Sequence, residues 1–285
     1  MNVGFIGLGN MGNPMAESLL RNGYTLQVYD ICANNASDIL NNGASWCPSP
    51  CETAIGADVV VTSLPSPAAV EEVVLGENGI FEGLRDGSVY IDTTTNEPEL
   101  MRQIADKGIL RGIDVLDAPI SGGVVSAKTA ALTIFVGGEE IVFKRMESFL
   151  RCIGKNVIRM GDIGNGMTTK LINNIMMFIN FIGACEGMAI ATKANLDPKQ
   201  FVDAIRPSMG QSRMMERSLD HFLECKPLHS AINLGVKDMY LGNKLANAMN
   251  VELEISPIIE NILREFQDKG NAQADLFDYI QDYLK

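Results

Sequence analysis

The N-terminal segment Asn2–Asp30, NVGFIGLGNMGNPMAESLLRNGYTLQVYD, contains the pattern that decides the fold of this chain. A short apolar run, Asn2–Gly7, leads directly into a glycine-rich turn, and Met11–Asn22 then has apolar side chains at helical spacing. Leu26–Tyr29 fits a second short strand, which Asp30 closes. A strand, a GxGxxG turn, a helix and a second strand ending in an acidic residue form the fingerprint of a dinucleotide-binding unit.

The glycine-rich turn of residues 7–12 can hold the diphosphate of a dinucleotide. Gly7 allows a tight turn, Gly9 lets backbone N–H groups approach the pyrophosphate, and Gly12 lets the helix pack closely on the strand. The positive end of the helix that follows would then face the phosphates. We predict that this turn contacts the cofactor through Gly7, Leu8, Gly9, Asn10, Met11 and Gly12.

Asp30 bears on which dinucleotide is bound. A carboxylate at the end of the second strand can accept hydrogen bonds from the adenosine ribose hydroxyls and would repel a 2′-phosphate. The neighbouring residues Ile31–Ala36 include no Arg or Lys to hold that phosphate. We therefore expect NAD as the cofactor and expect NADP to be disfavoured.

Further strands are predicted along the first half of the chain, with helical segments between most of them. They are Asp58–Thr62, Ser88–Asp92, Val115–Asp117 and Leu132–Val136. Short apolar strands that alternate with helices predict a parallel sheet covered on both faces.

The second half of the chain is predicted to be helical. Met167–Ala194 fits one long helix of about 40 Å, whose middle is apolar nearly all round. Such a helix is buried on several sides, either inside one chain or at a subunit interface, and we expect a homodimer or homotetramer. Asp197-Pro198 and Ser256-Pro257 each combine an N-cap residue with Pro at the first helical position, so each predicts the start of a helix.

Together these patterns predict an α/β protein of two domains. Residues 1–163 would form a Rossmann domain with a parallel sheet that binds NAD. Residues 164–285 would form an all-helical domain for substrate binding and oligomerisation, led by the long interdomain helix. The length of 285 residues fits two domains, because single hydrophobic cores rarely grow beyond about 250 residues.

The composition disfavours several other classes of protein. The net charge of −12 argues against nucleic acid as a partner. The N-terminus lacks the basic region of a signal peptide, and the longest charge-free apolar stretch, Leu171–Cys185, is shorter than the roughly 20 residues of a membrane span. Of the six Cys only Cys47 and Cys51 lie close together, with no His to complete a metal set. We expect a cytoplasmic protein with reduced thiols and no metal, and neither nucleic acid nor a membrane as a partner.

A polar loop follows the predicted strand at Val115-Leu116. In open α/β sheets ligands bind at the carboxyl ends of the strands, where the loop Asp117–Gly123 would lie. Ser121 offers a hydroxyl, and the two glycines after it let backbone N–H groups approach an anion. A carboxylate is the natural guest, although a simple turn motif would explain the same residues.

The segment Gly164–Asn174, GNGMTTKLINN, carries the strongest candidate for acid/base chemistry. It is not a phosphate-binding loop, because Thr169 precedes the lysine where that motif has Gly. Lys170 and Asn174 lie four residues apart, on one face of the helix. Burial and the positive helix end both disfavour an ammonium, so Lys170 could exchange protons near neutral pH. An exposed lysine in the first turn is an equally good interpretation of this segment alone.

Five motifs, in this order, resemble those of the β-hydroxyacid dehydrogenase family, which includes 3-hydroxyisobutyrate dehydrogenase, tartronate semialdehyde reductase and relatives of 6-phosphogluconate dehydrogenase. The resemblance covers essentially the whole chain. The motifs are GFIGLGNMGNPMA at 4–16, DTTTNEP at 92–98, DAPISGG at 117–123, GNGMTTKLINN at 164–174 and KDMYLG at 237–242.

The resemblance implies a Rossmann domain followed by a helical domain, with the active site between them. The catalytic lysine of the family falls on Lys170, and its substrate-binding asparagine falls on Asn174. The residues that bind the substrate carboxylate fall on Ser121, Gly122 and Gly123. The contacts to the nicotinamide nucleotide fall on Leu64, Pro65, Thr95 and Lys237. The implied reaction is hydride transfer between NAD and a small 3-hydroxy acid or its semialdehyde.

Three residues depart from the pattern of the family. Ala130 stands where a glycine is usual, which predicts a modest backbone change. Gln211 stands where several hydroxyisobutyrate-like members have Arg, and Ser230 stands where many have an aromatic residue. By the resemblance, these last two line the part of the pocket that faces the variable end of the substrate.

Other functions fit parts of the sequence. A 2-hydroxy acid dehydrogenase would use a His base, but His221 and His229 both fall in the helical half, where surface or cap roles are expected. An imine or other carbonyl reductase on the same fold, and a non-catalytic dinucleotide-binding module, would each be expected to lack the lysine that stands at position 170.

Overall fold

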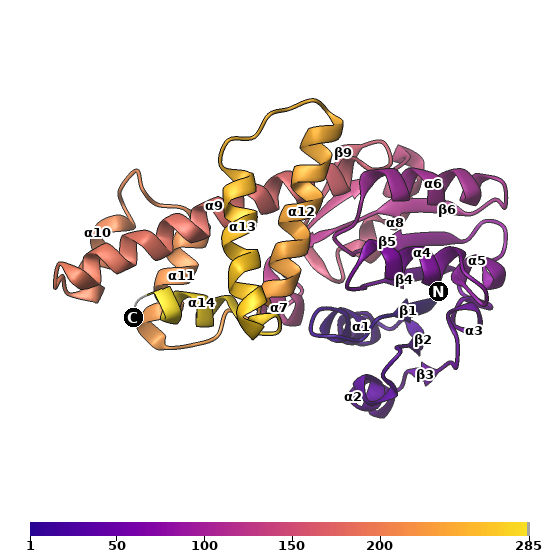
Figure 1. Ribbon diagram of the computed structural model, residues 1–285. Coiled ribbons are helices and arrows are strands. Elements are labelled where there is room, and N and C mark those ends of the chain that lie inside the picture. The colour runs from indigo at the N-terminus through magenta and orange to yellow at the C-terminus, as the bar shows by residue number, and fades with distance from the viewer. Residues whose placement is uncertain (284–285) are drawn as a thin grey trace. The chain divides into compact units, whose positions relative to one another are not determined.

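In the computed structural model, which describes residues 1–283, the chain forms two compact units divided between Lys170 and Leu171 (Figure 1). The first unit is built on a mostly parallel sheet with helices, and the second contains only helices. The predicted fold class, a Rossmann domain followed by an all-helical domain, is confirmed.

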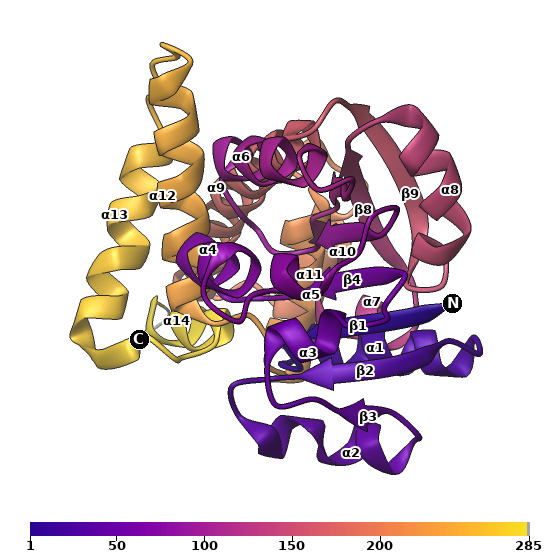
Figure 2. The same cartoon turned by 90° about the vertical axis from the view of Figure 1, so that its right-hand side faces the viewer.

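Nine strands form the sheet of the first unit, and their spatial order is β3-β2-β1-β4-β5-β6-β8-β7, with β9 paired to β8. Figure 2 shows β1, β2 and β4 side by side. The pairs from β3 to β6 are all parallel, as the alternation of strands and helices predicted. The strands are β1 (Asn2–Ile6), β2 (Thr25–Tyr29), β3 (Ser45–Trp46), β4 (Val59–Thr62), β5 (Val89–Asp92), β6 (Asp114–Asp117), β7 (Ile120–Ser121), β8 (Leu132–Gly137) and β9 (Gly154–Gly161).

One edge of the sheet differs from the prediction. Strand β8 runs antiparallel to β6 and β7. Strand β9 pairs with β8 in parallel and was not predicted, because its eight residues, GKNVIRMG, form neither an apolar run nor a regular alternation. The two-residue strands β3 and β7 are too short to give a periodic signal.

Helices cover both faces of this sheet. Alternate strand residues point to opposite faces, so Val59 and Val61 join one apolar cluster with α1 and α8, whereas Val60 joins the other with α4, α5 and α6. The helices are α1 (Gly12–Arg21), η1 (Ala33–Ala36), α2 (Ser37–Asn41), α3 (Pro50–Ala54), α4 (Pro67–Leu75), α5 (Ile80–Gly83), α6 (Pro98–Ile109), α7 (Gly123–Lys128) and α8 (Glu140–Leu150).

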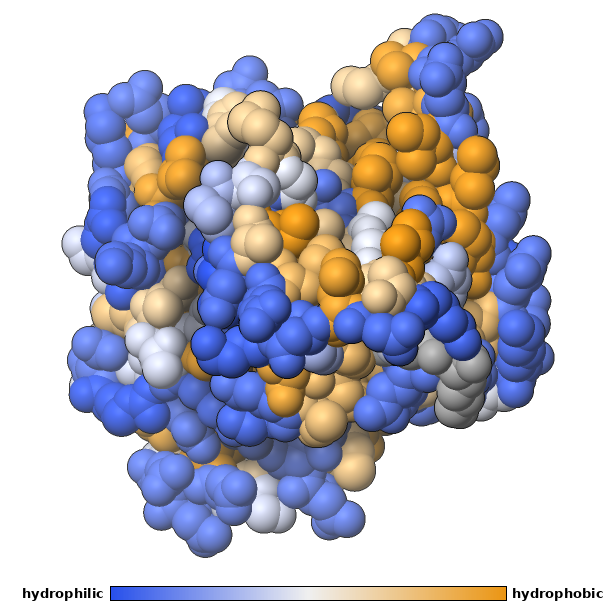
Figure 3. Space-filling model, turned by 90° about the vertical axis from the view of Figure 1, so that its left-hand side faces the viewer, coloured by the Kyte–Doolittle hydropathy of each residue, from blue (hydrophilic) through white to orange (hydrophobic). Residues whose placement is uncertain are grey.

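Helix α9 (Asn165–Lys193) begins in the first unit and continues into the second, within two residues of its predicted bounds. Phe178, Phe181 and Met188 are buried as predicted, whereas Met176 and Ile190 are 60% and 71% exposed, so residues 1–283 of one chain leave one side of the helix uncovered. By length and hydropathy alone α9 could cross a membrane, a property that it shares with core helices of soluble proteins. Figure 3 shows that apolar side chains gather in patches on the face of the molecule drawn there.

The second unit packs its other helices around a single apolar cluster that includes Phe178, Leu219, Met239 and Leu263. The long helices α12 and α13 lie side by side (Figures 1 and 2). The helices are α10 (Pro198–Ile205), α11 (Arg213–Glu224), α12 (Ile232–Ala248), α13 (Ser256–Phe266), η2 (Gln267–Asn271) and α14 (Leu276–Tyr283).

Both predicted helix starts are confirmed, because α10 begins at Pro198 and α13 at Ser256, but only one of the two predicted caps is formed. Asp197 is the N-cap of α10, and its carboxylate accepts a hydrogen bond of 2.8 Å from the N–H of Gln200, as predicted. Ser256 is already helical, and its hydroxyl donates to Oδ1 of Asn243 at 2.6 Å. The N-cap interpretation of Ser256 is therefore wrong, because a partner on α12 competes for its side chain.

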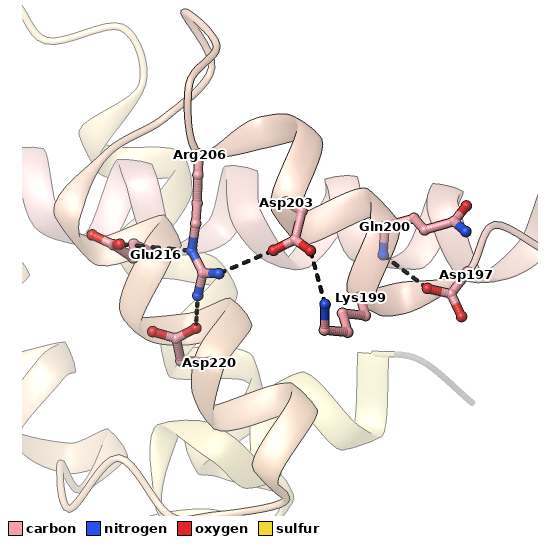
Figure 4. Close-up of polar contacts among 7 residues, drawn as sticks. All are labelled: Asp197, Lys199, Gln200, Asp203, Arg206, Glu216 and Asp220. Atoms are coloured by element: carbon pink, nitrogen blue, oxygen red, sulfur yellow. Dashed lines mark hydrogen bonds and ion pairs between the residues drawn. The ribbon is translucent and has the colours of Figure 1, made fainter.

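Helices α10 and α11 are joined by a cluster of charges around Arg206 (Figure 4). The guanidinium contacts Asp203 at 3.2 Å, Glu216 at 3.7 Å and the carboxylate of Asp220. These groups are all partly exposed, so each pair stabilises the fold by at most about 1 kcal/mol. The cluster fixes the ends of the connection that carries Gln211, which is exposed.

Candidate active-site residues

The carboxyl ends of β1, β4, β5 and β6 form one row at the edge of the sheet. Ile6 is in register with Thr62, Thr62 with Asp92, and Asp92 with Asp117. Neighbouring strands lie about 4.8 Å apart, so the loops that follow them adjoin in the same order. Open α/β sheets bind ligands at this edge. It brings together the predicted residues that directly follow these strands, namely Gly7 to Gly12, Leu64, Pro65, Thr95 and Ser121 to Gly123.

The glycine-rich turn has the geometry that a diphosphate needs. Gly7 has φ +92°, which only glycine adopts readily. A Cβ at Gly12 would overlap the carbonyl oxygen of Gly7, whereas a Cβ at Gly9 would meet no atom within 4 Å. Helix α1 starts at Gly12, and within residues 1–283 no side chain caps its start. An anion at the turn would face the positive end of this helix, while the N–H of Asn13 donates to the Gly9 carbonyl oxygen at 3.1 Å and Pro14 has no N–H. The turn fits the pyrophosphate of a dinucleotide.

Asp30 is buried and fixes this turn to the end of β2. Its Oδ2 accepts a hydrogen bond of 2.6 Å from the N–H of Leu8, and its Oδ1 accepts from Cys32 N–H at 2.8 Å and from Asn35 Nδ2 at 3.1 Å. A carboxylate has about four acceptor positions, so one remains for a ribose hydroxyl. The sequence analysis did not foresee that Asp30 also shapes the turn.

Asp92 organises the loops after β4 and β5. Its Oδ1 accepts hydrogen bonds from the Thr62 hydroxyl at 2.8 Å and from the Thr94 N–H at 3.0 Å. The Thr94 hydroxyl in turn accepts from the N–H of Leu64 at 2.9 Å. Burial raises the pKa of Asp92 in spite of these donors. Sequence reasoning missed Asp92 and Thr94, although both stand in the quoted motif DTTTNEP. They fix the backbone on either side of the predicted cofactor contacts Leu64 and Thr95.

Asp117 contacts the start of α9 in the same unit. Its carboxylate accepts a hydrogen bond of 2.7 Å from the N–H of Gly164 and one of 2.6 Å from the N–H of Met167. Burial, the largest influence, raises the pKa of Asp117 from 3.8 to about 6. Lys170 lies one turn farther along α9 and is only 9% exposed, so the interpretation of an exposed first-turn lysine is wrong.

The predicted carboxylate-binding loop is half-buried. Ser121 ends the short strand β7, and the glycines that follow have φ +132° at Gly122 and +72° at Gly123, where α7 begins. Ala130, which stands where a glycine is usual in the resembled family, has φ +52°. Alanine therefore adopts a left-handed conformation there, and the modest backbone change relative to the family stays a prediction.

In the second unit, Asn174 and Lys237 come together through Asp238. The side-chain amide of Asn174 donates a hydrogen bond of 2.6 Å to Asp238 Oδ2, and Lys237 Nζ lies 3.0 Å from Asp238 Oδ1. Asn173 Nδ2 donates to Asn174 Oδ1 at 3.0 Å. Asp238 was missed as a site residue, although it lies in the quoted motif KDMYLG. The signal available in the sequence was a carboxylate directly after Lys237, a predicted cofactor contact.

The remaining candidates lie apart from these networks. The N–H of Ser230 donates to Asp275 Oδ2 at 2.8 Å, so the residue that precedes α14 fixes the turn that carries Ser230. His221 Nδ1 contacts the backbone oxygen of Lys226 at 2.9 Å. Between residues 1 and 283 no group of three or more His, Cys, Asp or Glu could hold a metal ion.

Two family models cover almost the whole chain. The one described as the NAD binding domain of 6-phosphogluconate dehydrogenase matches residues 2–161. The one described as the NAD-binding domain of NADP-dependent 3-hydroxyisobutyrate dehydrogenase matches residues 164–283.

Individual proteins match over similar lengths. The chain is 38% identical over 289 residues to the mitochondrial 3-hydroxyisobutyrate dehydrogenase of Homo sapiens, covering 98% of this chain and 85% of that protein. It is 32% identical over 278 residues to the 2-(hydroxymethyl)glutarate dehydrogenase of Eubacterium barkeri, covering 97% and 92%. The crystal structure of a 3-hydroxyisobutyrate dehydrogenase from Salmonella typhimurium superimposes with a TM-score of 0.88 at 28% identity, covering 99% of both chains.

Proposed function

Because the chain belongs to the 3-hydroxyisobutyrate dehydrogenase-like β-hydroxyacid dehydrogenase family, whose members oxidise a CH–OH group with NAD(P), we propose that Lys170 is its catalytic acid/base. The observation that carries this proposal is the burial of Lys170 on α9, four residues before Asn174. Burial disfavours the charged form of an amine in general, and a lysine that is readily neutral can act as a base.

The substrate we propose is a small 3-hydroxy acid. Ser121 and the backbone N–H groups of Gly122 and Gly123 would hold its carboxylate, and Asn174 would orient Lys170. The hydrogen bond from Asn174 to Asp238 supports this role, because it fixes the rotamer of the asparagine.

In the oxidation direction, neutral Lys170 would take the proton of the substrate hydroxyl. Residues 7–12 and Asp30 would hold NAD, and the chemistry that NAD would supply is acceptance of the hydride from the carbon that bears this hydroxyl. The product is then the semialdehyde. In the reverse direction Lys170, as the ammonium, would return the proton to the developing alkoxide. Positioning of the reactants would supply much of the rate.

We also propose that NAD is preferred to NADP. Asp30 places a carboxylate at the end of β2, and the next residue, Ile31, is 95% exposed and carries no charge. A 2′-phosphate near this strand end would therefore meet a negative charge without a compensating cation.

The test is a set of initial rates of nicotinamide reduction over a panel of 3-hydroxy acids, with NAD and NADP in parallel. Wild type and Lys170→Ala would be compared, with Lys193→Ala, an exposed lysine at the other end of α9, as the matched control. We expect turnover that falls at least about 100-fold in Lys170→Ala and is unchanged in the control. If NAD binds but no 3-hydroxy acid reacts, the proposed substrate class is wrong, and imines and non-acid carbonyls become the next panel.

A further inference from the structure

Asp117 completes the N-terminus of α9 from a distant element. The helix begins at Asn165, so Gly164 occupies the N-cap position and Met167 is the third helical residue. In a capping box, the helix's own side chains accept the N–H bonds of these two positions. Gly164 has no side chain, and here the carboxylate of Asp117 at the end of β6 accepts both bonds, at 2.7 and 2.6 Å.

The surroundings leave room for this carboxylate. A Cβ at Gly137 on β8 would overlap Asp117 Oδ1, and a Cβ at Gly166 would overlap the carbonyl oxygen of Phe135 and lie 2.8 Å from Asp117 Oδ2. Glycines of two elements therefore form the space in which the carboxylate sits, with no exposed surface. Such a buried charge is rarely a gain in stability, since its desolvation offsets its hydrogen bonds.

We propose that Asp117 is a positioning residue that holds Lys170 in place for proton transfer. Lys170 follows Met167 by three residues and so lies on the adjacent turn of the same face. Asp117 also begins the loop that leads to Ser121, so one carboxylate fixes both the helix of the proposed acid/base and the start of the proposed substrate loop. This inference rests on the proposed role of Lys170.

The experiment is single-turnover hydride transfer in NAD-saturated enzyme, with the best 3-hydroxy acid of the panel as substrate. The rate constant reports the chemistry, whereas the amplitude reports the fraction of folded, NAD-loaded sites. Asp117→Asn keeps the shape of the side chain but offers an NH₂ group to one of the two N–H donors. Gly166→Ala keeps Asp117 but places a Cβ against the carbonyl oxygen of Phe135 and against Asp117 Oδ2, so the start of the helix must shift away from both. Asp162→Asn is the matched control, because this carboxylate lies only two residues before Gly164 but its side chain is 95% exposed.

We expect the rate constant to fall about 10- to 100-fold in Asp117→Asn and in Gly166→Ala, with the dissociation constant of NAD within about 2-fold of wild type. Asp162→Asn should keep the rate constant. A merely structural role would lower the amplitude alone, and unchanged rate constants in both variants would overturn the proposal. If Asp117→Asn does not fold, Gly166→Ala decides. A Lys170→Ala enzyme that keeps the wild-type rate constant would instead refute the proposed function.

Discussion

The side-chain amide of Asn174 donates a hydrogen bond of 2.6 Å to the carboxylate of Asp238. The other oxygen of the same carboxylate pairs with Lys237 at 3.0 Å. A predicted substrate contact on α9 and a predicted cofactor contact on α12 therefore share one partner.

We expect Asp238→Ala to lower kcat/KM about 10- to 100-fold, because both side chains lose the group that orients them. The kcat/KM of Asp238→Asn should lie between those of wild type and Asp238→Ala, since asparagine retains one acceptor oxygen. Steady-state kinetics with circular dichroism checks this, and the exposed carboxylate in Glu254→Gln is the control. Full activity of Asp238→Ala would show that Asn174 and Lys237 need no common partner.

The buried carboxylate of Asp117 should make stability depend on pH. Its pKa rises from 3.8 to about 6 on folding, so the folded state holds the proton more tightly than the unfolded state. The resulting stabilisation is present below pH 4 and is lost as pH rises through 6. A difference of 6 − 3.8 = 2.2 pKa units corresponds to about 3 kcal/mol.

The raised pKa of Asp92 acts in the same direction. The free energy of unfolding in urea should therefore be measured between pH 4 and 7 for both wild type and Asp117→Asn. The difference between the two proteins reports the Asp117 carboxyl alone, because both retain Asp92. As pH rises, the unfolding free energy of Asp117→Asn should increase relative to that of wild type, because only wild type loses this stabilisation. Parallel curves for the two proteins would contradict the raised pKa.

Ala130→Gly should stabilise the protein by about 1 kcal/mol, because alanine pays a steric cost at φ +52° that glycine does not. Chemical unfolding at constant pH measures this. Ala131→Gly, the next residue, is the control and should destabilise, since its φ is not positive. Loss of stability in Ala130→Gly would mean that the lower chain entropy of alanine in the unfolded state outweighs the strain.

The cofactor preference should be alterable at the end of β2. Ile31→Arg adds a cation at a side chain that is 95% exposed, so we expect tighter binding of NADP with little change for NAD. Asp30→Ser in that background should shift the preference further, although it also removes the acceptor of the Leu8 N–H. The dissociation constants of NADH and NADPH, measured by the fluorescence of their reduced nicotinamide, test this prediction. Ile55→Arg, at another exposed isoleucine, is the control for added charge.

The exposed side of α9 should form part of a subunit interface. Met176 and Ile190 are large apolar residues with 60% and 71% exposure. We expect wild type to be a homodimer or homotetramer by light scattering, and Met176→Lys with Ile190→Lys to lower its mass. Ile109→Lys, at an exposed position of the first unit, should leave the mass unchanged. A wild-type protein with the mass of a monomer would contradict the prediction of a homo-oligomer.

The sequence by itself determined the features that depend on neighbours along the chain. A short apolar run located β1, helical spacing located α1, and the turn chemistry located Gly7 and Gly12, because each signal is complete within a short segment. Strand β9 was not predicted, because its pairing with β8 makes it a strand and it has no apolar pattern of its own.

Only the tertiary structure decided which polar groups meet. Asp92 with Thr94 and Leu64, Asp117 with the start of α9, and Asn174 with Asp238 are contacts set by strand register and helix packing. Ser256 shows the same limit, since a partner on α12 draws its hydroxyl away from the predicted cap. A local pattern fixes where a side chain lies on its own element, whereas its hydrogen-bond partner depends on which element the fold brings beside it.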